Sequence, residues 1–123
     1  MNRYLVGFSY HEPEAYDLYR RGVAEDFESS TGIFITAESS EKAISWGEQI
    51  AAALLKVVNS DESLNWKEMG YHAWIEKDEA KSSWRHCFSF FQTVKTGEMP
   101  NFRKMGTNAY LEWAKANGIK YVK

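Results

Sequence analysis

The chain of 123 residues is long enough for one domain around one core and leaves little room for a second. A hydrophobic share of 44% beside a charged share of 26% is typical of soluble globular proteins and argues against wholesale disorder. The net charge of −2 gives no broad positive field, which argues against nucleic-acid binding. We therefore expect a single domain over residues 1–123.

The sequence carries no clear signal for export or for membrane insertion. The N-terminal apolar stretch is too short for the core of a signal peptide, because it meets His11 and Glu12 at once. No later run approaches the ~18 apolar residues of a membrane span. The one cysteine, Cys87, forms no internal disulfide, in agreement with a reducing compartment. We expect a cytoplasmic protein that does not bind membranes.

The first predicted elements are a strand over residues 4–10 and a short helix over residues 12–21. Apolar residues alternate along the strand, and the side that carries Tyr4, Val6 and Phe8 is expected to face the core. Pro13 suits the first helical position and Gly22 the end of the helix. Three residues in or next to this helix are not required for its buried side, so we treat them as candidate binding residues. These are His11, Tyr16 and Arg20.

A second strand over residues 33–37 and a long helix follow, with Ser39 as the expected N-cap. The helix is predicted from one apolar stripe at helical spacing, which should cover the sheet. The stripe consists of Ala43, Gly47, Ile50, Ala51, Leu54, Val57 and Val58.

The C-terminal half begins with a predicted strand over residues 71–77, which has Trp74 on one side and Ala73 and Ile75 on the other. Residues 84–96 fit either a helix or a strand; we predict a helix, and the alternative is a hairpin that pairs residues 83–91 with 71–77. A last helix, capped by Thr107 or Asn108, is expected to end at Ala116, and residues 119–122 add a short edge strand.

These elements together predict an α+β fold in a single small domain. We expect a three- to four-stranded sheet, mixed or antiparallel, with helices packed mainly on one face.

The sequence contains no recognisable catalytic, metal-binding or phosphate-binding motif. Cys87 and His86 are neighbours and so point apart on a helix or a strand, which prevents a catalytic pair between them. The three histidines lack the spacing of a metal site, and the glycines are too dispersed for a phosphate loop. We expect no catalytic residue, no metal and no cofactor, and the chain is more easily understood as a protein that is not an enzyme.

The far side of the sheet offers a second set of candidate binding residues. If Val6 and Phe8 face the covering helices, Leu5 lies on the reverse face, and Phe34 and Trp74 join it if the strands keep matching phases. There are two alternatives for these residues. Either the 84–96 helix or the C-terminal helix covers them, or they form an exposed patch that serves as a partner site, a homodimer interface or a ligand groove.

Two functions remain open at this point. The first is a small soluble non-enzymatic protein-binding domain, such as an inhibitor, an immunity-type protein or an adaptor, with a protein partner or a second copy. It is favoured by five Trp, seven Tyr and seven Phe, since aromatic rings anchor protein interfaces. The alternative is a small enzyme or a binder of an anionic small molecule, with a pocket near His11 and Arg20.

Overall fold

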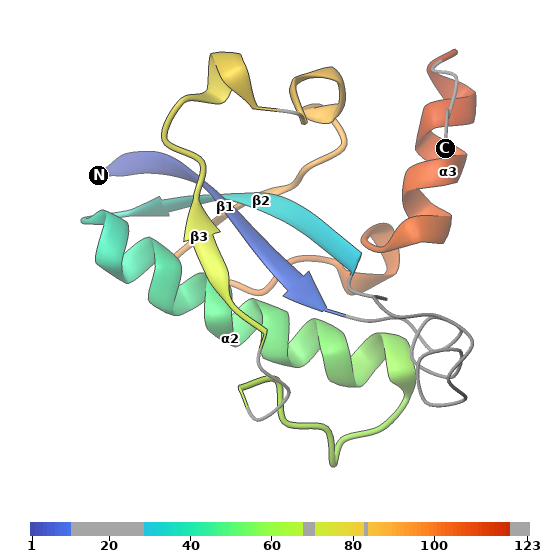
Figure 1. Ribbon diagram of the computed structural model, residues 1–123, viewed down its shortest axis with the longest axis horizontal. Coiled ribbons are helices and arrows are strands. Elements are labelled where there is room, and N and C mark those ends of the chain that lie inside the picture. The colour runs from blue at the N-terminus through green and yellow to red at the C-terminus, as the bar shows by residue number, and fades with distance from the viewer. Residues whose placement is uncertain (11–28, 68–70, 83, 119–123) are drawn as a thin grey trace.

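A computed structural model describes residues 1–10, 29–67, 71–82 and 84–118, and these build a mixed sheet of four strands in the order β3-β1-β2-β4 (Figure 1). The bounds are β1 at Asn2–Tyr10, β2 at Ser29–Ala37, β3 at Ala73–Ile75 and β4 at Thr93–Lys95. β1 runs antiparallel to both β2 and β3, whereas β4 runs parallel to β2. The predicted α+β class is confirmed. The predicted helix over residues 12–21 and the edge strand over 119–122 lie outside the described residues.

The strand register decides which residues share a face of the sheet. Val6 lies opposite Ile33 on one side and Ile75 on the other, so these three face the same way. Leu5 lies opposite Phe34, and Gly7 lies opposite Trp74, on the reverse face. The strands therefore keep the matching phases that the sequence predicted for Leu5, Phe34 and Trp74.

One face of the sheet is covered by the helix α2, Ser40–Asn59. Ser39 caps it as predicted, because its hydroxyl accepts a hydrogen bond from the backbone N–H of Lys42 at 3.2 Å. The buried stripe matches the prediction at five positions, and Leu55 joins it. Val57 was wrongly placed in the stripe: its side chain is 51% exposed, because Leu55 takes the inward-facing position in that turn.

The opposite face is covered by irregular chain between β3 and β4, which Figure 1 shows on the other side of the sheet from α2. This chain contains two short 3₁₀ turns, η1 at Glu79–Lys81 and η2 at Arg85–Cys87. Its backbone bonds join residues three apart, for example Cys87 N–H to Trp84 C=O and Phe91 N–H to Phe88 C=O. The predicted helix over 84–96 is therefore wrong, and so is the hairpin alternative, since the strand that follows is β4 and it pairs with β2.

The rings of this stretch have tertiary partners in two directions. Phe88 contacts Phe34 of the sheet, whereas Phe90 contacts Trp113 of the last helix. The tight turns place rings toward both partners within a short stretch of chain.

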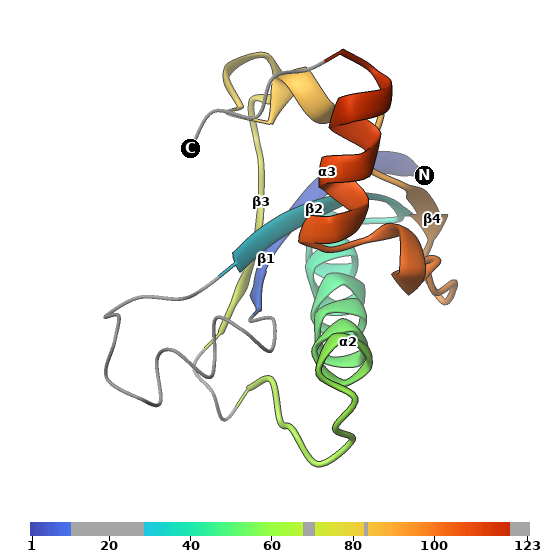
Figure 2. The same cartoon turned by 90° about the vertical axis from the view of Figure 1, so that its right-hand side faces the viewer.

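The last helix, α3 at Thr107–Ala116, stands to one side of the strands in Figure 1 and in front of them in Figure 2, so it lies beyond one end of the sheet. Its N-cap is Gly106, with a φ of 92°, so the predicted capping by Thr107 or Asn108 is wrong. The predicted inward side is confirmed in part, because Ala114 is buried and Tyr110 and Trp113 are half-buried. Within the described ranges, no helix has both the length and the apolar character needed to cross a membrane.

Candidate functional site

The reverse face of the sheet carries a continuous set of rings, which we name the aromatic layer. Its members come from β3, from the turns after it and from α3: Trp74, Trp84, Phe88, Phe90, Phe91, Tyr110 and Trp113. Every one of these side chains is only half-buried. Trp74 and Trp84 are stacked with their ring centres 6.0 Å apart, and Trp84 meets Phe91 edge to face at 5.4 Å. The layer is thus packed within itself and still reaches solvent.

The floor of this layer is formed by two of the predicted binding residues, and both are buried. Leu5 is 1% exposed and Phe34 is 4% exposed. Phe88 meets the Phe34 ring edge to face at 5.6 Å, and the Arg3 guanidinium lies 4.3 Å from the centre of the same ring. Of the two alternatives for Leu5 and Phe34, an exposed patch is wrong and coverage by residues 84–96 is what the structure shows: the turns at 84–91 cover them, and only Trp74 of the three reaches the surface.

Two glycines make room for the layer at its base. A Cβ atom on Gly7 would lie 2.6 Å from the Trp74 ring, and one on Gly32 would lie 2.8 Å from the Phe91 ring. The two glycines are direct neighbours across β1 and β2. The indole and the phenyl ring therefore approach the sheet where no side chain stands, which lets large rings cover it closely.

The far end of the layer joins α3. Phe90 contacts both Tyr110 and Trp113, with ring centres 5.5 and 5.6 Å apart. The hydroxyl of Tyr110 lies 3.0 Å from Nε2 of the exposed His86, at hydrogen-bond distance. This contact and the ring contacts attach α3 to the turns.

The one thiol of the chain lies in the covering turns and is not placed for chemistry. Cys87 is 3% exposed, and its Sγ donates a weak hydrogen bond to the Trp84 carbonyl at 3.3 Å. Burial raises the pKa of the Cys87 thiol, so the reactive thiolate is disfavoured. Within the described ranges, no three His, Cys, Asp or Glu side chains come close enough together to hold a metal ion.

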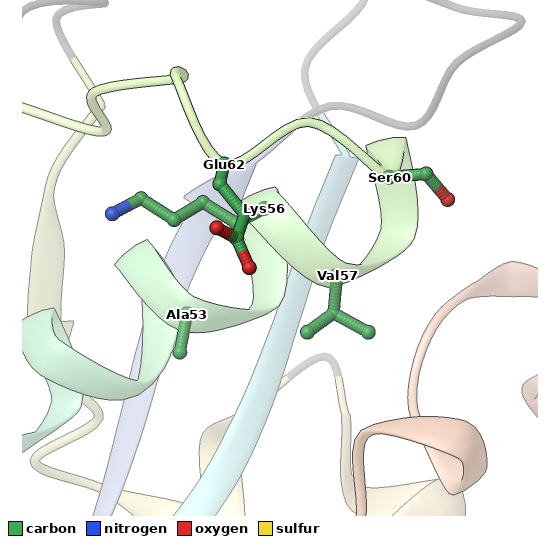
Figure 3. Close-up of a pocket in the computed structure, with 5 residues that line it drawn as sticks. All are labelled: Ala53, Lys56, Val57, Ser60 and Glu62. Atoms are coloured by element: carbon green, nitrogen blue, oxygen red, sulfur yellow. The ribbon is translucent and has the colours of Figure 1, made fainter.

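A hollow of about 710 Å³ lies at the C-terminal end of α2, away from the aromatic layer (Figure 3). The lining residues are Ala53, Lys56, Val57, Ser60 and Glu62. Figure 3 shows the Lys56 and Ser60 side chains pointing in different directions, so the polar groups do not converge on one ligand position. Lys56, Ser60 and Glu62 are residue types that can act in catalysis, but the Lys56 and Ser60 side chains point apart, so the hollow assembles no catalytic pair between them.

The remaining predicted site residues, His11, Tyr16 and Arg20, lie outside the described residues, and the pocket predicted near them stays a prediction. Sequence reasoning did not assign Trp84, Phe88 or Phe90 to a site, although their rings make up much of the layer. The available signal was the aromatic density of residues 84–91, which was interpreted as one stripe of a helix. Comparison of the chain with models of protein families, with curated proteins and with solved structures found no match.

Proposed function

We propose that the protein is a small non-enzymatic binding domain that recognises another protein through the aromatic layer. The observation that carries this proposal is that each of the seven rings contacts at least one other ring of the layer and yet remains half-buried. Half-buried rings keep apolar area that a partner can remove from water, and Trp and Tyr are frequent anchors of protein interfaces.

The packing of the layer also favours binding over mere coverage of the sheet. Trp74 and Trp84 are held by stacking, and Phe90, Tyr110 and Trp113 are held by three mutual ring contacts. Rings that are already fixed lose little side-chain entropy when a partner docks, which raises the affinity for a given contact area.

The chemistry of the described residues supports a role in binding. The thiol of Cys87 is buried and its pKa is raised, and the exposed His86 faces the hydroxyl of Tyr110. A surface of this kind suits an inhibitor, an immunity-type protein or an adaptor, because each acts by occupying the surface of another protein.

The test adds a charge to the layer without removing any ring. Ser89 is exposed between Phe88 and Phe90, so Ser89→Arg places a long hydrated side chain among the rings. Ser45→Arg is the matched control, because Ser45 is exposed on α2, which covers the opposite face of the sheet. Both variants should unfold within a few degrees of the unchanged protein, since surface substitutions usually change stability by less than ~0.5 kcal/mol.

Each protein is immobilised and used to capture partners from an extract of the native cell, and the affinity of each captured protein is then measured by titration. We expect the same partner to bind the unchanged protein and Ser45→Arg, and its affinity for Ser89→Arg to fall by at least about 10-fold, since a misplaced charge costs a well-packed interface a few kcal/mol. Equal binding by all three, or capture of no defined partner, would contradict the proposal.

A further inference from the structure

Among the residues that the structure describes, no strand pairs with the outer edge of β3, which we call the open edge. β3 is the end strand of the order β3-β1-β2-β4, and Figure 1 shows it in front of β1 while Figure 2 shows it at the side of the sheet opposite β4. An open edge presents unpaired backbone N–H and C=O groups to any other strand of suitable register.

The hydrogen bonds to β1 show which groups point outward. Ser9 N–H donates to His72 C=O at 3.2 Å, and Glu76 N–H donates to Leu5 C=O at 2.9 Å. Because antiparallel pairs alternate between bonded and non-bonded, the residues that bond β1 are His72, Trp74 and Glu76. The N–H and C=O groups of Ala73 and Ile75 therefore point away from β1, and no partner for these four groups is found in the described part of the chain.

The opposite edge of the sheet is closed by its own chain. In β4 the outward-pointing Lys95 donates its N–H to Glu98 Oε1 at 2.8 Å, and its C=O accepts from the Glu98 N–H at 2.9 Å. Trp46 fixes the turn by donating its indole N–H to the Glu98 C=O at 2.8 Å. Proteins often protect a sheet edge in this way, by bonding its outward N–H and C=O groups within the same chain. No such bonds to Ala73 or Ile75 are found in the described part of the chain.

We propose that a second copy of this chain pairs with the β3 edge as an antiparallel strand, related by a two-fold axis at Trp74. In this register Ala73 lies opposite the partner's Ile75 and Ile75 opposite the partner's Ala73, so that all four outward groups of each copy are used. Two sheets of four strands then join into one sheet of eight, and both α2 helices lie on the same side of it.

The side chains of β3 favour a second copy of the chain in this register, because the polar side chains of one strand lie opposite complementary side chains of the other. On the reverse face, the exposed His72 lies opposite the partner's Glu76, and the same pair forms a second time across the axis. The register makes both of these non-bonded pairs, in which side chains lie closest. Glu76 Oε1 accepts from the Ser82 hydroxyl at 3.2 Å, and since no partner of Oε2 is found in the described part of the chain, that oxygen can accept from the partner's imidazole. Moving the axis to Glu76 would instead place two carboxylates opposite each other.

The first test measures mass by equilibrium sedimentation over a range of concentrations. The chain has a mass of 14.2 kDa, and we expect the unchanged protein to reach twice that mass as its concentration rises. Ala73→Pro removes an N–H that points outward, so it costs the monomer no sheet hydrogen bond and should leave only the monomer. Thr93→Pro is the matched control, because the Thr93 N–H points away from β2 at the opposite edge, and it should dimerise normally.

A second test remains informative if the proline variant does not fold. Glu76→Lys places a cation opposite the partner's His72 and should raise the dimer dissociation constant by about 10-fold over the two pairs. Adding His72→Glu to it should restore the constant to within about 3-fold of the original. Residues 72 and 76 of one strand are ~13 Å apart, too far for a contact within the monomer, so this rescue reports a contact between copies.

An unchanged protein that sediments as a monomer at every concentration would overturn the proposal. So would a dimer that persists in Ala73→Pro, or a double variant that is no tighter than Glu76→Lys. The axis lies at Trp74, a member of the aromatic layer, but the two proposals are tested separately: Ser89→Arg changes the layer between Phe88 and Phe90 and should leave the mass of the dimer unchanged.

Discussion

The two faces of the sheet are covered in different ways by the same chain. On the α2 face, aliphatic residues such as Val6, Ile35 and Leu54 are fully buried under a regular helix. On the reverse face, irregular turns bring half-buried rings over Leu5 and Phe34. A regular helix with one apolar stripe therefore buries the aliphatic residues of one face, whereas the rings on the other face keep accessible apolar area, which is the feature that the proposed binding function uses.

The largest effect is expected from the α2 face. Leu54 is fully buried, and Leu54→Ala should lower the free energy of unfolding by about 2–5 kcal/mol, because it removes apolar contacts and leaves a cavity. Val57→Ala on the same helix is the control, and its cost should be below ~0.5 kcal/mol, since Val57 is half-exposed. Denaturant unfolding of both variants measures the difference. Equal costs would mean that the α2 face does not carry the stability assigned to it.

A smaller effect is expected where the aromatic layer meets the sheet. Gly7→Ala would place a Cβ 2.6 Å from the Trp74 ring, and we expect a loss of about 1–3 kcal/mol because the ring must shift. In a Trp74→Leu background the same change should cost less, because the ring is gone, and a double-mutant cycle measures the coupling. A coupling of zero would show that Trp74 does not lie on Gly7 in solution.

The smallest effect concerns Cys87 in the covering turns. Cys87→Ser should cost about 1 kcal/mol, since a buried hydroxyl replaces the thiol and retains the Trp84 carbonyl as its acceptor. The raised pKa of the Cys87 thiol also gives a pH dependence. Above the pKa of an exposed cysteine, about 8.5, the unfolded chain loses the proton first, so the free energy of unfolding falls as pH rises.

The free energy of unfolding is measured against pH for the unchanged protein and for Cys87→Ser. The difference between the two slopes gives the contribution of the Cys87 thiol. The thiol should also react slowly with a disulfide reagent in the folded protein and quickly after unfolding. Reaction at the unfolded rate in the folded protein would show that the turns at 84–91 open readily and do not cover the sheet.

The sequence by itself determined the elements that have a regular period. The alternation around Val6, the Ser39 cap and the stripe from Ala43 to Leu54 each depend on residues that lie within a few positions of one another. Alternation along a strand fixes the direction of each side chain within that strand, but Leu5, Phe34 and Trp74 share a face only because the strands pair in the register that the structure shows.

Only the tertiary structure decided what covers that face and which edge stays open. The rings of residues 84–91 have helical spacing, but their partners are Phe34 in β2 and Trp113 in α3, which the local pattern does not contain. Likewise, Glu98 closes the β4 edge, whereas no partner for the outward backbone groups of Ala73 and Ile75 is found in the described residues, and this follows from strand order. Contacts between residues distant in sequence are fixed by packing of the whole chain, so tertiary contacts override local preference at these places.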